Sequence, residues 1–143
     1  MILYLDTSAL VKLYVDEDGT LQARRGVGDA EVVSTSEIAY VELRAALARR
    51  YREGALKPAE HRRALRDLHR DWPQFFLIAV GSALVREAGA LAEYYRLRAY
   101  DAVHLASSLA VQAQTEEVVT FASWDRALAE VAVKAGLQPL PIV

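Results

Sequence analysis

The chain has 143 residues, the usual size of one domain, so we expect a single hydrophobic core. Its content of 53% hydrophobic and 25% charged residues excludes extensive disorder. It contains no cysteine, which excludes a disulfide framework, a thiolate nucleophile and a zinc site built from sulfur. No apolar run approaches the roughly 20 residues that span a bilayer, and the first residues do not resemble a signal peptide. We therefore expect a cytoplasmic protein that does not bind membranes.

The formal net charge is only −2, but the charge is unevenly distributed along the chain. The segment 44–70 holds nine basic and three acidic residues, a local charge of +6, and the remainder carries −8. Two interpretations of this basic segment stay open. It could contact RNA or a protein partner, or it could be a solvated arginine-rich face, which is the more common case.

The first half of the chain begins with an apolar, β-favouring run at 1–5, which predicts a strand. A helix through residue 14 should follow, capped by Thr7 or Ser8. A second strand is expected at 31–33. The spacing of Ser34 and Glu37 suggests a capping box that opens a helix over about 36–53. Pro58 suits the first turn of another helix.

In the second half, strands are predicted at 75–80, 117–121 and 140–143, and helices at 83–95, 101–113 and 124–134. Strands that alternate with helices imply right-handed crossovers and a parallel sheet. The expected fold is an α/β three-layer sandwich, α/β/α, with a mostly parallel central sheet of four to five strands. No repeat or linker interrupts the chain, so residues 1–143 are expected to form one domain.

Acidic residues follow the predicted strands, at the edge where open α/β sheets bind their ligands. Asp6 comes directly after the first strand, and Asp125 follows the fourth strand together with Ser123. Asp101 opens a helix whose start should face the same edge. Glu42 lies on or beside the helical stripe that should face the core, where a charge needs a partner. We expect these four acids to converge.

Each acid also has a purely structural interpretation. Asp101 and Asp125 could cap helices or interact with helix dipoles, and Asp6 could accept hydrogen bonds from backbone amides in a turn. Glu42 could lie at the edge of its stripe with its carboxylate in water. These interpretations do not require the acids to meet.

If the four carboxylates share a pocket, a cation must neutralise them, because two like charges 4 Å apart cost about 4 kcal/mol at an effective dielectric of 20. Mg²⁺ or Mn²⁺ suits oxygen ligands of this kind. The histidines argue against zinc, since His61 and His69 lie on the basic helix, far along the chain from the acids. His104, one turn after Asp101, is interpreted as a hydrogen-bonded core residue rather than a ligand.

Four sequence blocks carry a resemblance to a known family: LYLDTSALVKLY, YVELRAAL, RAYDAVHLASS and ASWDRAL occur in this order along nearly the whole chain. Together they resemble the PIN domain, and most closely the VapC-type toxin ribonucleases. The resemblance implies that Asp6, Glu42, Asp101 and Asp125 are metal-binding acids. It also implies that Ser8 and Ser123 are site hydroxyls, with Ser123 standing where many members have threonine; Thr7 could play a similar part.

The function implied by this resemblance is that of a metal-dependent endoribonuclease. It would hydrolyse RNA at a four-carboxylate Mg²⁺ or Mn²⁺ site, with Glu42 completing the site or orienting the attacking water, and would leave a 5′-phosphate and a 3′-hydroxyl. Members of the family are usually silenced by a small antitoxin and often form homodimers. Arg96 and Arg98, just before Asp101, are expected to contact the RNA backbone.

Two alternative functions remain. The first is a non-catalytic PIN-fold module that binds RNA or a protein partner. The second is a phosphotransfer protein with an aspartyl nucleophile, such as a haloacid-dehalogenase-like phosphatase or a receiver domain. The phosphatase pattern requires an aspartate where this chain has Ser8. The receiver pattern requires a lysine after its fifth strand, whereas Lys134 precedes the last predicted strand.

Overall fold

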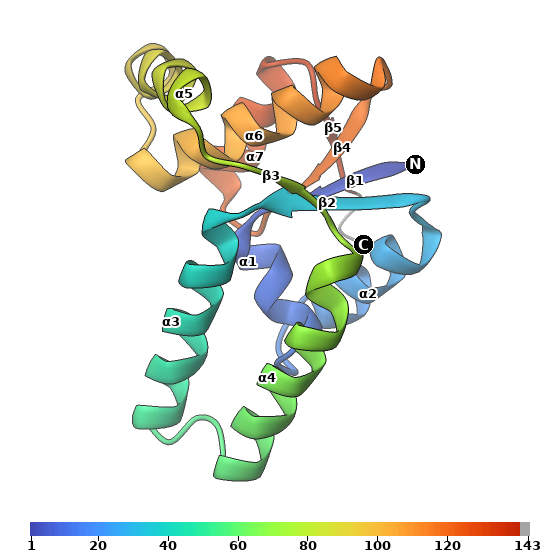
Figure 1. The fold of residues 1–143 in the computed structure, drawn as a ribbon, viewed down its shortest axis with the longest axis vertical. Helices are drawn as coiled ribbons and strands as arrows, with labels where there is room; N and C mark the ends of the chain where they lie inside the picture. The colour runs from blue at the N-terminus through green and yellow to red at the C-terminus, as the bar shows by residue number, and fades with distance from the viewer. Residues whose placement is uncertain (141–143) are drawn as a thin grey trace.

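A computed structural model describes residues 1–140 and shows a five-stranded sheet between two layers of helices (Figure 1). All neighbouring strands are parallel, in the order β3-β2-β1-β4-β5. The strands are β1 (Ile2–Leu5), β2 (Val32–Ser36), β3 (Phe76–Ile78), β4 (Val119–Ala122) and β5 (Gln138–Pro139). Helices cover both faces, which confirms the expected α/β/α sandwich.

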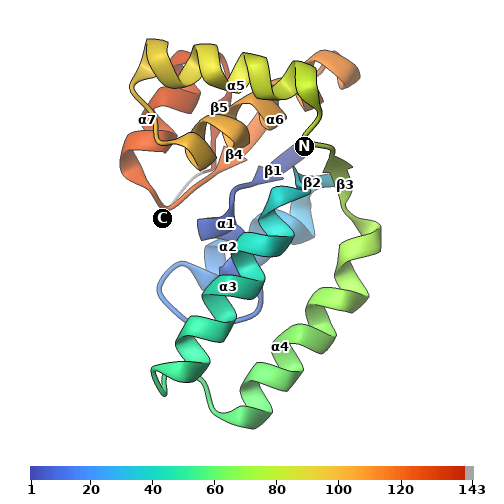
Figure 2. The same cartoon turned by 60° about the vertical axis from the view of Figure 1, so that its left-hand side comes forward.

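The helices divide by position in the chain. The first group comprises α1 (Thr7–Leu10), α2 (Thr20–Asp29), α3 (Ile38–Arg52) and α4 (Pro58–Asp71), and the second comprises α5 (Ser82–Tyr95), α6 (Ala99–Thr115) and α7 (Arg126–Lys134). The two groups of helices pack on opposite faces of the sheet. Figure 2 shows that α3 and α4 form a hairpin that projects away from the sheet. No helix in residues 1–140 has the length and apolarity required to cross a membrane.

The central strand β1 contributes to two separate cores. Ile2 and Tyr4 pack against the face that carries α5 to α7, whereas Leu3 and Leu5 pack against the face that carries α1 to α4. A parallel strand covered on both faces is apolar along its whole length, which explains the uninterrupted ILYL run. Because β1 lies beside β4, the residue that follows each strand reaches the same edge.

The first half of the chain differs from the prediction in two ways. Helix α2 was not predicted, because it begins after Gly19 without a side-chain cap and contains two glycines, so its local signals are weak. The predicted capping box does not form, because Ser34 lies inside β2 and its hydroxyl donates to the carbonyl of Phe76 at 2.8 Å. The strand continues to Ser36, and the helix begins only at Ile38.

Several element ends also differ from the prediction. The helix expected through residue 14 is the short α1 followed by a 3₁₀ turn, Val11–Leu13, and Asp6 caps it rather than Thr7 or Ser8. Pro58 does open α4 as predicted. The predicted final strand at 140–143 is wrong at its start, since β5 is Gln138–Pro139; residues 141–143 lie outside the described part of the chain.

Candidate functional site

Asp6 lies at the end of β1, where its backbone N–H donates to the carbonyl of Ala122 on β4 at 3.2 Å. Its side chain is buried, and Oδ1 accepts from Ala9 N at 2.9 Å and from Ser8 Oγ at 2.6 Å. Burial raises the pKa of Asp6 above its usual range, although hydrogen bonds from Ser123 and Ser8 act in the opposite direction. Ionised Asp6 is therefore poorly solvated, and a nearby cation would stabilise it.

Two serine hydroxyls connect Asp6 to the end of β4. Ser8 Oγ accepts from the backbone N–H of Trp124 at 2.9 Å while it donates to Asp6. Ser123 Oγ accepts from the backbone N–H of Asp125 at 3.1 Å. Both predicted site hydroxyls thus lie at the edge that holds Asp6 and Asp125, where they bond to the acids or to the backbone beside them.

Glu42 is held by a hydrogen-bonded chain that reaches into the core. Its Oε1 lies 2.8 Å from Thr7 Oγ1 and 2.8 Å from His104 Nε2. On the other side of the ring, His104 Nδ1 lies 2.8 Å from the hydroxyl of Tyr4. An ionised carboxylate only accepts hydrogen bonds, so Nε2 carries the proton and Nδ1 of the neutral ring accepts from Tyr4. The tautomer of His104 follows from these partners.

This series of hydrogen bonds keeps Glu42 ionised and Tyr4 neutral. Burial by itself would raise the pKa of Glu42, but the hydrogen bonds from His104 and Thr7 act in the opposite direction, and the pKa is lowered. Tyr4 is completely buried, which raises the pKa of its hydroxyl well above its usual value. The Glu42 carboxylate is therefore held by His104 and Thr7, with its side chain 23% exposed. His104 is a hydrogen-bonded core residue as predicted, but it also orients a candidate site acid.

Asp101 and Asp125 are joined by one arginine. Arg98 Nε donates to Asp101 Oδ2 at 3.0 Å, and Arg98 Nη2 donates to Asp125 Oδ2 at 3.0 Å. Asp125 also caps α7, since its Oδ1 accepts from Leu128 N at 3.1 Å. Asp101 lies in the first turn of α6 but is not its cap, a position that Arg98 occupies. The hydrogen bond to Asp101 and the charges of both acids raise the pKa of Arg98, so its guanidinium is always charged.

The four acids thus reach one end of the sheet in two hydrogen-bonded groups. Glu42 forms one group with His104, and Asp6, Asp101 and Asp125 belong to the other. Glu42 bonds to His104, three residues after Asp101 on α6, and Ser8 bonds both Asp6 and the residue before Asp125. Within residues 1–140, no group of three or more acidic or histidine side chains is close enough to hold a metal ion. The expected four-carboxylate cluster is not assembled in this structure, and the metal assignment stays a prediction.

The chemistry of the donor set nevertheless fits a hard divalent ion. Asp101 and Asp125 already bind one cationic group between them, and every acid presents carboxylate oxygen. The nearby imidazole of His104 is occupied on both nitrogens. Mg²⁺ or Mn²⁺ therefore suits this edge better than zinc.

Arg96 and Arg98 occupy different surroundings, although both were predicted to contact RNA. Arg96 ends α5 in the left-handed conformation, with φ 57°, and its side chain is exposed. Arg98 instead turns to the acids, while its side chain remains 79% exposed. Their contact with RNA stays a prediction.

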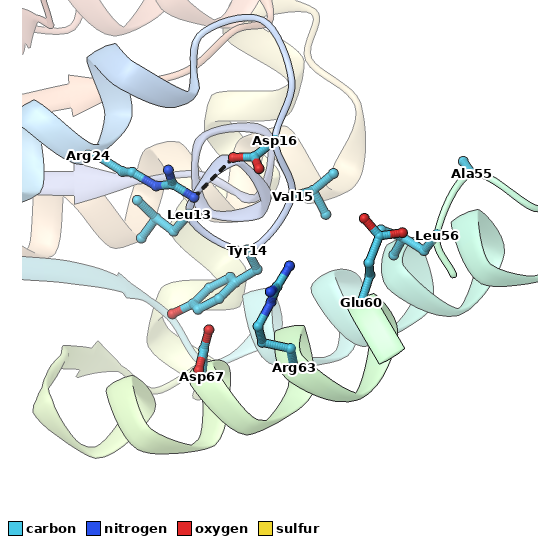
Figure 3. Close-up of a pocket in the computed structure, with 10 residues that line it drawn as sticks. All are labelled: Leu13, Tyr14, Val15, Asp16, Arg24, Ala55, Leu56, Glu60, Arg63 and Asp67. Atoms are coloured by element: carbon cyan, nitrogen blue, oxygen red, sulfur yellow. Dashed lines mark hydrogen bonds and ion pairs between the residues drawn. The ribbon is translucent and has the colours of Figure 1, made fainter. Parts of the chain in front are cut away.

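A separate cavity of about 340 Å³ lies between the loop after α1 and the start of α4 (Figure 3). Arg63 of α4 extends toward Tyr14 there, and an Asp16–Arg24 ion pair of 3.2 Å closes one side. None of the four candidate acids is among its lining residues, so it is distinct from the site. It is formed by segments far apart in the sequence, and no local motif marks it.

Comparisons with known proteins agree with this architecture. A family model described as PIN domain matches residues 3–134. Ribonuclease VapC45 of Mycobacterium tuberculosis is 37% identical over 144 residues, covering 98% of this chain and 95% of that protein. The crystal structure of PAE2754 from Pyrobaculum aerophilum has a TM-score of 0.66 at 21% identity, covering 98% of this chain and 84% of the other.

A toxin–antitoxin complex from Klebsiella pneumoniae has a TM-score of 0.57 at 18% identity, covering 82% of this chain and 83% of the chain compared. The two structural similarities establish the fold only. The family match and the relative in M. tuberculosis extend over nearly the whole sequence and carry the assignment. The chain therefore belongs to the PIN domain family.

Proposed function

We propose that this chain is a metal-dependent endoribonuclease and the toxin of a type II toxin–antitoxin pair. The observation that carries the proposal is the pair of Asp101 and Asp125, which share the guanidinium of Arg98, with Asp6 at the adjoining carboxyl end of β1. The relative named as a ribonuclease supports the same activity. The implied substrate is RNA, hydrolysed at a phosphodiester bond.

The residues divide into two roles. Asp6, Asp101 and Asp125 would hold Mg²⁺ or Mn²⁺ directly or through water, and the chemistry supplied by the bound ion is neutralisation of charge on the scissile phosphate. Glu42 is ionised, and Thr7 and His104 both bond to its Oε1. We assign Oε2 of Glu42 to orient the attacking water and accept its proton.

The serine hydroxyls of the site hold the carboxylates in position. Ser8 and Ser123 fix Asp6 against the backbone beside Asp125, so that carboxylates from two strands keep a constant relation. The resemblance of the fold to a chain of a toxin–antitoxin complex supports a small antitoxin as partner. The family further implies a homodimer in the cytoplasm, and the basic segment 44–70 and Arg96 are available to contact RNA.

The test is cleavage of a defined single-stranded RNA by the purified chain, with Mg²⁺ or Mn²⁺ and with EDTA. Asp6→Asn should abolish ion-dependent cleavage, because it removes one of the charged ligands. The matched control Asp29→Asn changes an exposed acid at the end of α2 and should cleave at the wild-type rate. Full cleavage by Asp6→Asn, or cleavage undiminished by EDTA, would contradict the proposed mechanism.

The alternative is a PIN-fold module that binds RNA or a protein without cleaving it. It predicts RNA binding that is unaffected by the Asp6→Asn change, and no cleavage under any ion. The ordered chain from Tyr4 through His104 to Glu42 favours the enzyme, because a surface used only for binding does not require a buried network to orient one carboxylate.

A further inference from the structure

The contact made by Arg98 joins two acids that come from different elements. Asp101 belongs to the first turn of α6, and Asp125 is the cap of α7. The two carboxylates keep side-chain exposures of only 20% and 32%, whereas the arginine between them is 79% exposed. The guanidinium therefore covers the acid pair from the solvent side.

The backbone holds Arg98 in place for this contact. Arg98 is the N-cap residue of α6, with φ −65° and ψ 156°, and its carbonyl accepts from Ala102 N at 3.0 Å. Asp101 lies three residues further along the first turn, a spacing that brings their side chains together. The planar guanidinium donates through two different nitrogens, so one group can serve both carboxylates.

We propose that Arg98 is a positioning residue that occupies the cation position between Asp101 and Asp125 when no divalent ion is bound, and that ion binding displaces it. The inference rests on the proposed function, since it concerns the same acids. The guanidinium uses Oδ2 of both acids, and Oδ1 of Asp125 already caps α7, so a divalent ion between the acids would compete with Arg98 for Asp125 Oδ2. Arg98 thereby sets the divalent-ion affinity of the site.

The exposure of Arg98 makes this exchange feasible. Its side chain can move into solvent without leaving a buried charge unpaired, because the departing guanidinium is rehydrated. Asp125 cannot move in the same way, because its Oδ1 also caps α7. The displaced guanidinium remains tethered beside the site, where it can contact an RNA phosphate.

The experiment measures Mn²⁺ binding to the full chain by isothermal titration calorimetry, without RNA. Arg98→Ala removes the competitor and should bind Mn²⁺ about three- to tenfold more tightly than the wild type, in line with two solvent-exposed ion pairs. Arg98→Lys keeps the positive charge, but the compact ammonium group cannot span both carboxylates. The Mn²⁺ affinity of this variant should lie between that of the wild type and that of Arg98→Ala.

The matched control is Arg126→Ala. Arg126 is an exposed arginine directly after Asp125, so this change removes the same charge close to the same acid. Its Mn²⁺ affinity should stay within about twofold of the wild type. Far-UV circular dichroism of each variant verifies that the fold is intact.

Three results would overturn the inference. Unchanged or weaker Mn²⁺ binding by Arg98→Ala would show that Arg98 does not compete, while cleavage of RNA by the wild type would leave the proposed function standing. An equal gain in Arg126→Ala would assign the effect to net charge rather than to the bridge. If no variant bound Mn²⁺ and the wild type did not cleave RNA, the proposed function would fail together with this inference.

Discussion

The hydrogen bond between Tyr4 and His104 provides a direct test of the buried network. Tyr4→Phe removes only the hydroxyl oxygen, because the ring keeps its stacking on Phe121, with ring centroids 5.5 Å apart. His104 is 2% exposed, so water cannot replace the lost donor at Nδ1. An unsatisfied buried acceptor costs about 1 to 3 kcal/mol, and we expect the free energy of unfolding to fall by this amount.

Urea unfolding followed by far-UV circular dichroism measures this change, and the thermal midpoint should fall by about 3 °C for each kcal/mol lost. Tyr94→Phe is the matched control, because Tyr94 is 79% exposed and its change should have no measurable effect. In a double-mutant cycle with His104→Leu, the Tyr4→Phe change should cost much less, since its partner is already absent. A loss below about 0.5 kcal/mol for Tyr4→Phe in the wild-type background would refute the assigned network.

Three further predictions concern Asp6, two glycines and the divalent ion. Asp6→Asn should be more stable than the wild type at neutral pH. Burial raises the pKa of Asp6, so the native chain binds the Asp6 proton more tightly than the unfolded chain does. The stability of the wild type therefore falls as pH rises from the pKa of Asp6 in the unfolded chain through its pKa in the native chain. Urea unfolding between pH 4 and pH 7 would contradict this if the wild type gained stability relative to Asp6→Asn. Gly19→Ala should destabilise the fold by about 1 to 3 kcal/mol, because φ of Gly19 is 93° and an added Cβ would lie 2.5 Å from Trp124 Nε1. Gly89→Ala, in the exposed middle of α5, should instead stabilise the fold by about 0.5 to 1 kcal/mol. Equal effects of the two changes in thermal unfolding would refute the packing argument. Mn²⁺ at one hundred times its dissociation constant should stabilise the native chain by about 2.7 kcal/mol in differential scanning calorimetry, reversibly with EDTA, and an unchanged midpoint would oppose a native-state ion site.

Much of this architecture could be predicted from local sequence patterns. The alternation of apolar runs with helical stripes predicts a parallel sheet between helical layers, because each pattern reports which faces of an element are buried. The positions of Asp6 and Asp125 directly after strands predict that both reach one edge, since parallel strands place their carboxyl ends together. Helix α2 escaped prediction because Gly19, Gly26 and Gly28 are poor local signals, and its formation depends on packing.

Local patterns therefore specify the fold class and the edge that Asp6 and Asp125 reach, because burial periodicity and strand ends are local properties. The pairing of the acids, in contrast, depends on contacts between distant parts of the chain. Glu42 and His104 are separated by 62 positions, and Arg98 and Asp125 by 27. Contacts over such separations depend on the way α3, α6 and α7 are placed at one end of the sheet, which no short pattern encodes. For this reason the structure presents a histidine-bound glutamate and an arginine-bridged aspartate pair where the sequence predicted one cluster of four acids.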